Sequence, residues 1–153
     1  MATFYVARSE IITPLPWLTF ALPFSVLMVL VDTSAWIEWL IASPTGEKVE
    51  AHLPEQVDWL VPTRVQLELA KWLTREVGED KADQVIAFTQ VCKVVPLDSE
   101  IALSAAEACR EHKLATADVI IFATAQAHGA SLITCDQHFH GLRGVILIEK
   151  VKS

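Results

Sequence analysis

The longest uncharged stretch of the chain covers residues 11–31 and ends at Asp32. Its 21 residues are as many as a transmembrane helix needs. Pro14, Pro16 and Pro23 stand inside it, however, and each would remove a backbone hydrogen bond from such a helix. We therefore expect no membrane span, and the stretch has to be accommodated in another way.

The last part of this stretch, residues 26–31, is apolar and rich in Val and Leu. A short run of this kind is typical of a strand that is buried on both faces of a parallel sheet. We interpret Met28, inside this run, as the working start of the protein. Residues 1–27 are then an extension, loosely attached or created by an upstream start, and residues 28–153 form one domain, for which the length suffices.

Strand and helix patterns alternate along the rest of the chain. Strands are predicted over residues 58–61, 93–95, 131–135 and 145–148, and helices over residues 34–41, 46–52, 63–77, 81–91, 99–113 and 116–128. This alternation predicts an α/β fold, a three-layer α/β/α domain with a central parallel sheet of four to five strands. Functional sites in such sheets form beyond the carboxyl ends of the strands.

Two aspartates follow predicted strands and are therefore expected at the same edge of the sheet. Asp32 follows the first strand and Asp136 the fourth, although each also suits an ordinary turn. Asp118 lies in the first turn of an apolar helix, where it would complement the helix dipole. Because this helix is expected to be buried, the Asp118 carboxylate needs a partner, and its helix start points toward Asp32 and Asp136.

A fourth acid, Glu68, lies at the edge of the apolar face of the helix over residues 63–77. A surface ion pair with Arg64 or Lys71 would explain it. Alternatively, it faces a metal ion beside a basic strip of Arg64, Lys71 and Arg75 that follows a phosphate backbone. Glu76 projects into the same arc but lies two turns further from the helix start, so it is the weaker candidate.

Four converging carboxylates would repel one another unless a cation lay between them. Mg²⁺ or Mn²⁺ suits oxygen ligands and phosphate substrates, and such ions activate water for phosphodiester hydrolysis. His138 and His140 lack a third ligand in the sequence, and we interpret them as loop residues. The net charge of −7 argues against a general positive field for nucleic acid but leaves a metal-dependent nuclease open.

Glycine and cysteine usage excludes two further classes of site. The five glycines do not form a nucleotide-binding loop. Cys92, Cys109 and Cys135 are odd in number and widely spaced, so they form neither a disulfide framework nor a zinc site. Free thiols indicate a reducing compartment, and we expect a cytoplasmic protein.

Three segments together resemble the PIN-domain ribonucleases, and most of all the VapC toxins of toxin–antitoxin pairs. They are "VLVDTSAWIEWL", "VPTRVQLELAKWL" and "LATADVIIFATAQAHGASLITCDQHF", in the same order and spacing as in that family. The resemblance runs from about Met28 to the C-terminus. It implies that Mg²⁺ or Mn²⁺ is held by four acids, which are Asp32, Glu68, Asp118 and Asp136.

The resemblance further implies that the hydroxyls of Thr33, Ser34 and Thr134 orient these acids or polarise water. It implies an endoribonuclease that leaves a 5′-phosphate and a 3′-hydroxyl, forms a homodimer and is silenced by a cognate antitoxin. Two features depart from the family pattern. His138 stands where many members carry a further acid, and the 27-residue lead is additional.

Two further interpretations concern partners and alternatives. Trp36, Trp39, Leu40 and Trp72 either form an apolar groove for an antitoxin helix or belong to the core. From another class, the chain could be a catalytically weak PIN module or a receiver-like regulatory module. A receiver needs an acidic pair after the first strand, where Thr33 stands here. A phosphatase of the haloacid dehalogenase type needs a second acid where Ser34 stands.

Overall fold

The computed structural model describes residues 27–152. Its elements are β1 (Val29–Val31), α1 (Thr33–Leu40), α2 (Pro44–Glu50), η1 (Gln56–Asp58), β2 (Trp59–Pro62), α3 (Thr63–Val77), α4 (Glu79–Thr89), β3 (Lys93–Val95), α5 (Ser99–His112), α6 (Thr116–Ala127), β4 (Ser131–Thr134), η2 (Gln137–Phe139) and β5 (Val145–Leu147). Among these residues no helix has both the length and the apolarity to cross a membrane. The predicted extension, except Leu27, lies outside the described residues.

The strands form one parallel sheet in the order β3-β2-β1-β4-β5. Leu30 of β1 lies between Leu60 of β2 and Leu132 of β4. Every residue of β1 and β2 is buried, although consecutive side chains point to opposite faces. Both faces of the sheet are therefore covered at β1 and β2, which is why these two strands are continuous apolar runs in the sequence.

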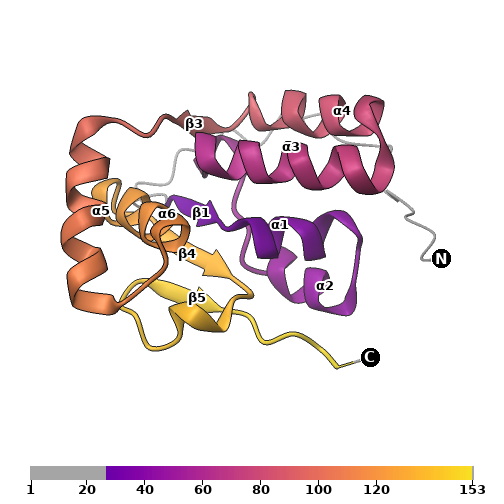
Figure 1. Cartoon of the computed structure of the whole chain (residues 1–153). Helices are drawn as coiled ribbons and strands as arrows, with labels where there is room; N and C mark the ends of the chain where they lie inside the picture. Colours follow the sequence, from indigo (N-terminus) through magenta and orange to yellow (C-terminus); the bar gives the residue numbers. More distant parts are fainter. Residues whose placement is uncertain (1–26, 153) are drawn as a thin grey trace, which may run out of the picture.

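The helices pack as three neighbouring pairs around this sheet. Figure 1 shows α3 beside α4 at the top, α5 beside α6 at the left and α1 beside α2 at the right. The three-layer α/β/α fold with a parallel central sheet, predicted from the alternation of strands and helices, is confirmed. The first turn of α6, the end of β1 and the end of β4 meet at one edge of the sheet, where the predicted acids lie.

Local sequence accounts for most of the element bounds. Helix α3 spans the predicted residues 63–77 because Val65, Leu69 and Leu73 recur on one buried face. The side chain of Asp98 accepts a hydrogen bond from the Ile101 N–H and so caps the start of α5. Strand β1 is shorter than the predicted strand and begins at Val29.

The tryptophans of α1 lie in the core and do not line an open groove. Trp36 has no exposed surface and Trp39 is 9 % exposed. Both pack edge-to-face on Trp59, and Trp36 also contacts Phe88 in the same way. Trp36 and Trp39 therefore belong to the core, as the second of the two interpretations proposed, because the aromatic rings from α1, β2 and α4 bury one another.

Leu40 and Trp72 differ from these two tryptophans in exposure. Each is partly buried at the margin of the core. Leu40 and Trp72 therefore differ from Trp36 and Trp39 in keeping part of their surface outside the core.

Candidate functional site

Asp32 lies directly after β1, at the position that precedes the first residue of α1. Its side chain is buried, with the residue 8 % exposed. Oδ2 accepts hydrogen bonds from Ser34 Oγ at 2.7 Å and from Thr134 Oγ1 at 2.9 Å. Asp32 is thus a buried carboxylate whose orientation is fixed by two hydroxyls, which is a poor fit to the alternative of an ordinary surface turn.

The same two hydroxyls join the end of β1 to the end of β4. Ser34 Oγ accepts from the Cys135 N–H at 3.0 Å, and Thr134 Oγ1 accepts from the Asp136 N–H at 3.0 Å. The network therefore fixes the backbone that carries Asp136 as well as the Asp32 carboxylate. The hydroxyls of Ser34 and Thr134 thus connect the Asp32 carboxylate to the backbone of Asp136 and its neighbour.

Glu68, on the second turn of α3, is held through both of its carboxylate oxygens. Thr33 Oγ1 donates to Oε2 at 2.5 Å, and Arg64 Nη2 lies 2.8 Å from Oε1. The ion pair suggested for Glu68 and Arg64 is therefore present. This ion pair does not turn the Glu68 carboxylate away from the site, because Thr33, which is next to Asp32, donates a hydrogen bond to its other oxygen.

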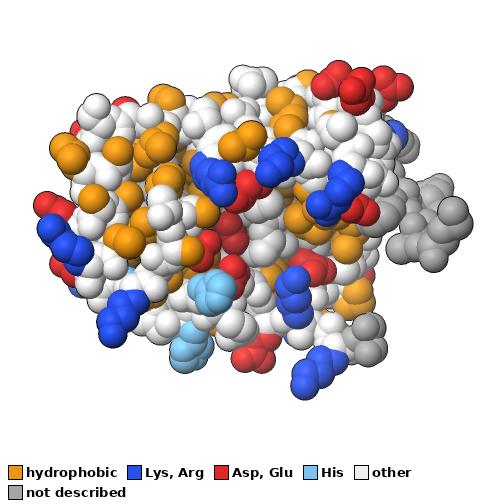
Figure 2. Space-filling model, in the orientation of Figure 1, with side chains coloured by type: hydrophobic (Ala, Val, Ile, Leu, Met, Phe, Trp, Pro, Cys, Tyr) orange, Lys and Arg blue, Asp and Glu red, His pale blue; other side chains and the backbone are white. Residues whose placement is uncertain are grey.

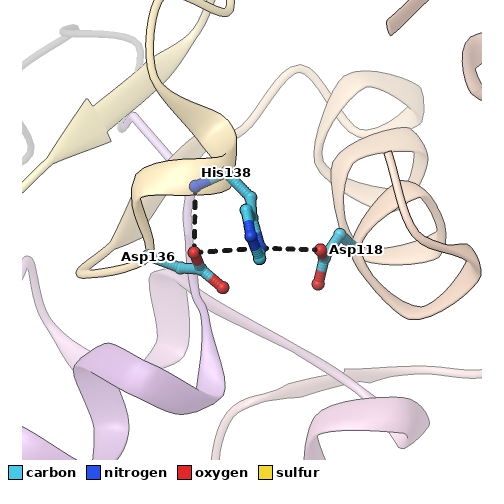
Figure 3. Close-up of side chains that lie close together, drawn as sticks. All are labelled: Asp118, Asp136 and His138. Atoms are coloured by element: carbon cyan, nitrogen blue, oxygen red, sulfur yellow. Dashed lines mark hydrogen bonds and ion pairs between the residues drawn. The ribbon is translucent and has the colours of Figure 1, made fainter. Parts of the chain in front are cut away.

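Asp118, in the first turn of α6, and Asp136, at the start of η2, lie on either side of His138 (Figure 3). His138 Nδ1 is 3.3 Å from Asp136 Oδ1 and 3.6 Å from Asp118 Oδ2. The His138 N–H also donates to Asp136 Oδ1 at 2.9 Å. The two aspartates thus face the same small space from different elements.

The electrostatics of the site disfavour negative charge. Burial raises the pKa of Asp32 above its ordinary value, the hydrogen bonds from Ser34 and Thr134 oppose this, and the charge of Glu68 adds to it. Burial also raises the pKa of Asp118, and the charges of Asp136 and Glu68 raise it further, while those of His138 and Arg64 oppose this rise. A cation at this place would relieve both effects, because it favours the ionised carboxylates.

The donor atoms fit a divalent cation. Asp118, Asp136 and His138 each present one ligand atom, and these atoms lie within 4.8 Å of one another. Carboxylate oxygens are the ligands that Mg²⁺ and Mn²⁺ prefer. Asp32 and Glu68 influence each other electrostatically, as do Glu68 and Asp118, but of the four predicted acids only Asp118 and Asp136 belong to this group of close ligand atoms.

A family model for the PIN domain matches residues 29–145. The chain belongs to the PIN domain family. The match runs from the start of β1 to the first residue of β5 and includes all four acids. No curated protein sequence matches the chain.

Solved structures share the fold of this PIN domain. A toxin–antitoxin complex from Klebsiella pneumoniae superposes with a TM-score of 0.70 at 22% identity, covering 80% of this chain and 99% of that one. FitAcB from Neisseria gonorrhoeae gives 0.61 at 24%, covering 72% and 89%. VapC20 from Mycobacterium tuberculosis, described as a toxin that cleaves the sarcin-ricin loop, gives 0.58 at 21%, covering 72% and 92%. At these identities the likeness establishes the fold alone.

The predicted basic strip of the PIN domain lies on α3. Figure 2 shows basic side chains in a row over this helix, above acidic side chains gathered at the centre of the face. Arg64 contacts Glu68, Lys71 is exposed, and Arg75 pairs with Glu76 at 2.6 Å. Because Arg75 and Glu76 pair with each other, this ion pair is separate from the contacts that join the four acids.

His138 is the residue of this site that the sequence did not reveal. We interpreted it with His140 as a loop residue because no third ligand stood at a regular spacing. The other two donors are Asp118, which lies in α6 and 20 positions away in the chain, and Asp136, which lies at the start of η2. The one available signal was its place two residues after Asp136, where the family pattern has an acid.

Proposed function

We propose that this PIN domain is a metal-dependent endoribonuclease that acts as the toxin of a toxin–antitoxin pair. The observation that carries the proposal is that four carboxylates, from the ends of β1 and β4 and from α3 and α6, lie near one edge of the sheet. Buried Asp32 is held by two hydroxyls, and the pKa values of Asp32 and Asp118 are raised. Because raised pKa values mean that the ionised carboxylates are unfavourable, a bound cation would stabilise these acids in their charged form.

Asp32, Glu68, Asp118 and Asp136 would hold Mg²⁺ or Mn²⁺. Such an ion supplies activation of water and stabilisation of the leaving oxygen in phosphodiester hydrolysis. Ser34 and Thr134 orient Asp32, and Thr33 orients Glu68, so the carboxylates are in position before substrate arrives. These hydroxyls thereby reduce the reorganisation that the reaction requires.

The basic side chains on α3 would bind the RNA backbone beside the acids. Lys71 is exposed on α3, where it could contact a phosphate group, and Arg64 pairs with Glu68, one of the four acids. The net charge of −7 requires such a local arrangement, because the protein as a whole repels RNA. Salt should therefore weaken RNA binding with a shallow slope, since few phosphate contacts are made.

The partners follow from the same proposal. A cognate antitoxin would dock a helix near Leu40, which is only partly buried, and neutralise the acids with Arg or Lys. The Klebsiella pneumoniae structure of the same fold is itself a toxin–antitoxin complex. We further propose a cytoplasmic homodimer whose PIN domain is residues 28–153. A chain that begins at Met28 should then fold and cleave as the full chain does.

Cleavage of a mixed RNA panel by the purified chain, free of antitoxin, tests the function. We expect cleavage with Mg²⁺ or Mn²⁺ that is lost with EDTA and in Asp32→Asn and Asp118→Asn. Asp83→Asn, an exposed residue of α4, is the matched control and should cut like the wild type. An inert wild type, or Asn variants that cut equally well, would reject the nuclease.

A further inference from the structure

His138 is exposed over 73 % of its side chain, yet its ring is turned toward the protein. It lies on η2, a single turn that Phe139 anchors by burying its ring almost completely. The N–H of His138 donates to Asp136 Oδ1 at 2.9 Å, which fixes the start of the turn. As a result Nδ1 faces Asp118 and Asp136 (Figure 3).

The spacing of these atoms suits a shared metal ion. Ligand atoms about 2.1 Å from an octahedral ion, at right angles to each other, lie about 3 Å apart. Nδ1 is 3.3 Å from Asp136 Oδ1 and 3.6 Å from Asp118 Oδ2. Small side-chain rotations would bring all three onto one ion, which His138 would bind through Nδ1.

We infer that His138 is a third ligand of this ion, and that its nitrogen makes the site prefer a first-row transition ion such as Mn²⁺ over Mg²⁺. The inference rests on the proposed function, which takes Asp118 and Asp136 as metal ligands. Mg²⁺ binds oxygen almost exclusively, whereas imidazole strengthens binding along the transition series. One nitrogen among carboxylate oxygens therefore shifts selectivity while leaving the charge of the site suitable for phosphate chemistry.

A second role for His138 would have the opposite consequence. If the imidazole served only as a counter-charge to Asp118 and Asp136, it would compete with any cation. Its removal would then strengthen the binding of Mg²⁺ and Mn²⁺ alike. Ligation predicts weaker binding on removal, and a larger loss for Mn²⁺ than for Mg²⁺. The two roles thus differ in the sign of the change.

The test uses the full chain freed of metal, with Mn²⁺ and Mg²⁺ as probes. Calorimetric titration gives both dissociation constants for the wild type, His138→Ala, His138→Asp and the control His140→Ala. His140 is exposed and lies just after η2. Pulsed electron paramagnetic resonance of bound Mn²⁺ reports nitrogen coordination directly. Circular dichroism confirms that each variant is folded.

We expect nitrogen coupling in the wild type and in His140→Ala, and none in His138→Ala. His138→Asp should bind Mg²⁺ as well as the wild type does but lose about tenfold or more of the preference for Mn²⁺. Missing nitrogen coupling in the wild type, an unchanged preference in His138→Asp, or tighter binding in His138→Ala would each overturn the inference while leaving the nuclease intact. A wild type that binds neither ion overturns both.

Discussion

Replacing Asp32 by Asn should stabilise the metal-free protein, although it removes a residue proposed as catalytic. Burial raises the pKa of Asp32, so the folded state holds its proton more tightly than the unfolded state, whose ordinary value is 3.8. The associated stability is present below that value and is lost as pH rises through the higher folded pKa. Once the pH exceeds the raised folded pKa, the native protein carries an unfavourable buried charge that Asn lacks.

Three contributions set the size of the effect. Burial of a carboxylate costs several kcal/mol. The hydrogen bonds from Ser34 and Thr134 recover part of this, and each weakens by about 1 kcal/mol when its acceptor becomes neutral. The repulsion from Glu68 also disappears. We expect a net gain of about 1–2 kcal/mol in the free energy of unfolding, or roughly 2–8 °C in melting temperature.

Urea unfolding in EDTA, followed by tryptophan fluorescence, measures this gain. Trp36, Trp39 and Trp59 contact one another in the core and report its loss. The control Asp83→Asn removes an exposed charge and should leave the midpoint nearly unchanged. The gain for Asp32→Asn should also shrink as the pH is lowered toward 4. A variant less stable than the wild type in EDTA at neutral pH would refute the reasoning, because the hydrogen bonds would then outweigh burial.

Three other substitutions test the surrounding structure. Thr33→Val removes the 2.5 Å hydrogen bond to Glu68 and should weaken Mn²⁺ binding in a calorimetric titration, whereas Thr33→Ser should preserve it. Gly46→Ala would place a Cβ 2.1 Å from the backbone oxygen of Glu38 and should lower the urea unfolding free energy by about 1–3 kcal/mol or more; wild-type stability would contradict this contact. Asp98→Ala removes the cap of α5 and should cost about 1 kcal/mol in the same assay, with Asp98→Asn close to the wild type.

The elements of the fold were largely predictable because their signals are local. The apolar spacing in α3 acts within a few residues, and it predicted the bounds 63–77 that the structure has. The start of the first strand was harder. Its apolar run extends beyond the residues that pair, and only the register of Val29 with Trp59 and Ser131 sets the beginning of β1.

Residue type alone did not decide the role of an apolar side chain. Trp36 and Trp72 are both large, apolar and helical, yet Trp36 has no exposed surface and Trp72 is partly buried at the margin of the core. The difference arises because Trp59 and Phe88, which come from other elements, enclose Trp36. A helical pattern gives the face of a helix but not what covers that face.

The sequence by itself determined that Asp32 and Asp136 end strands and that parallel strands bring them to one edge, since both facts depend on chain order and local pattern. The tertiary structure decided which groups meet there. Thr134 reaches Asp32 across 102 positions, and His138 meets Asp118 from a different element. Such contacts depend on sheet register and on how helices pack, which fix side-chain distances to within an ångström and leave no periodic trace in the chain.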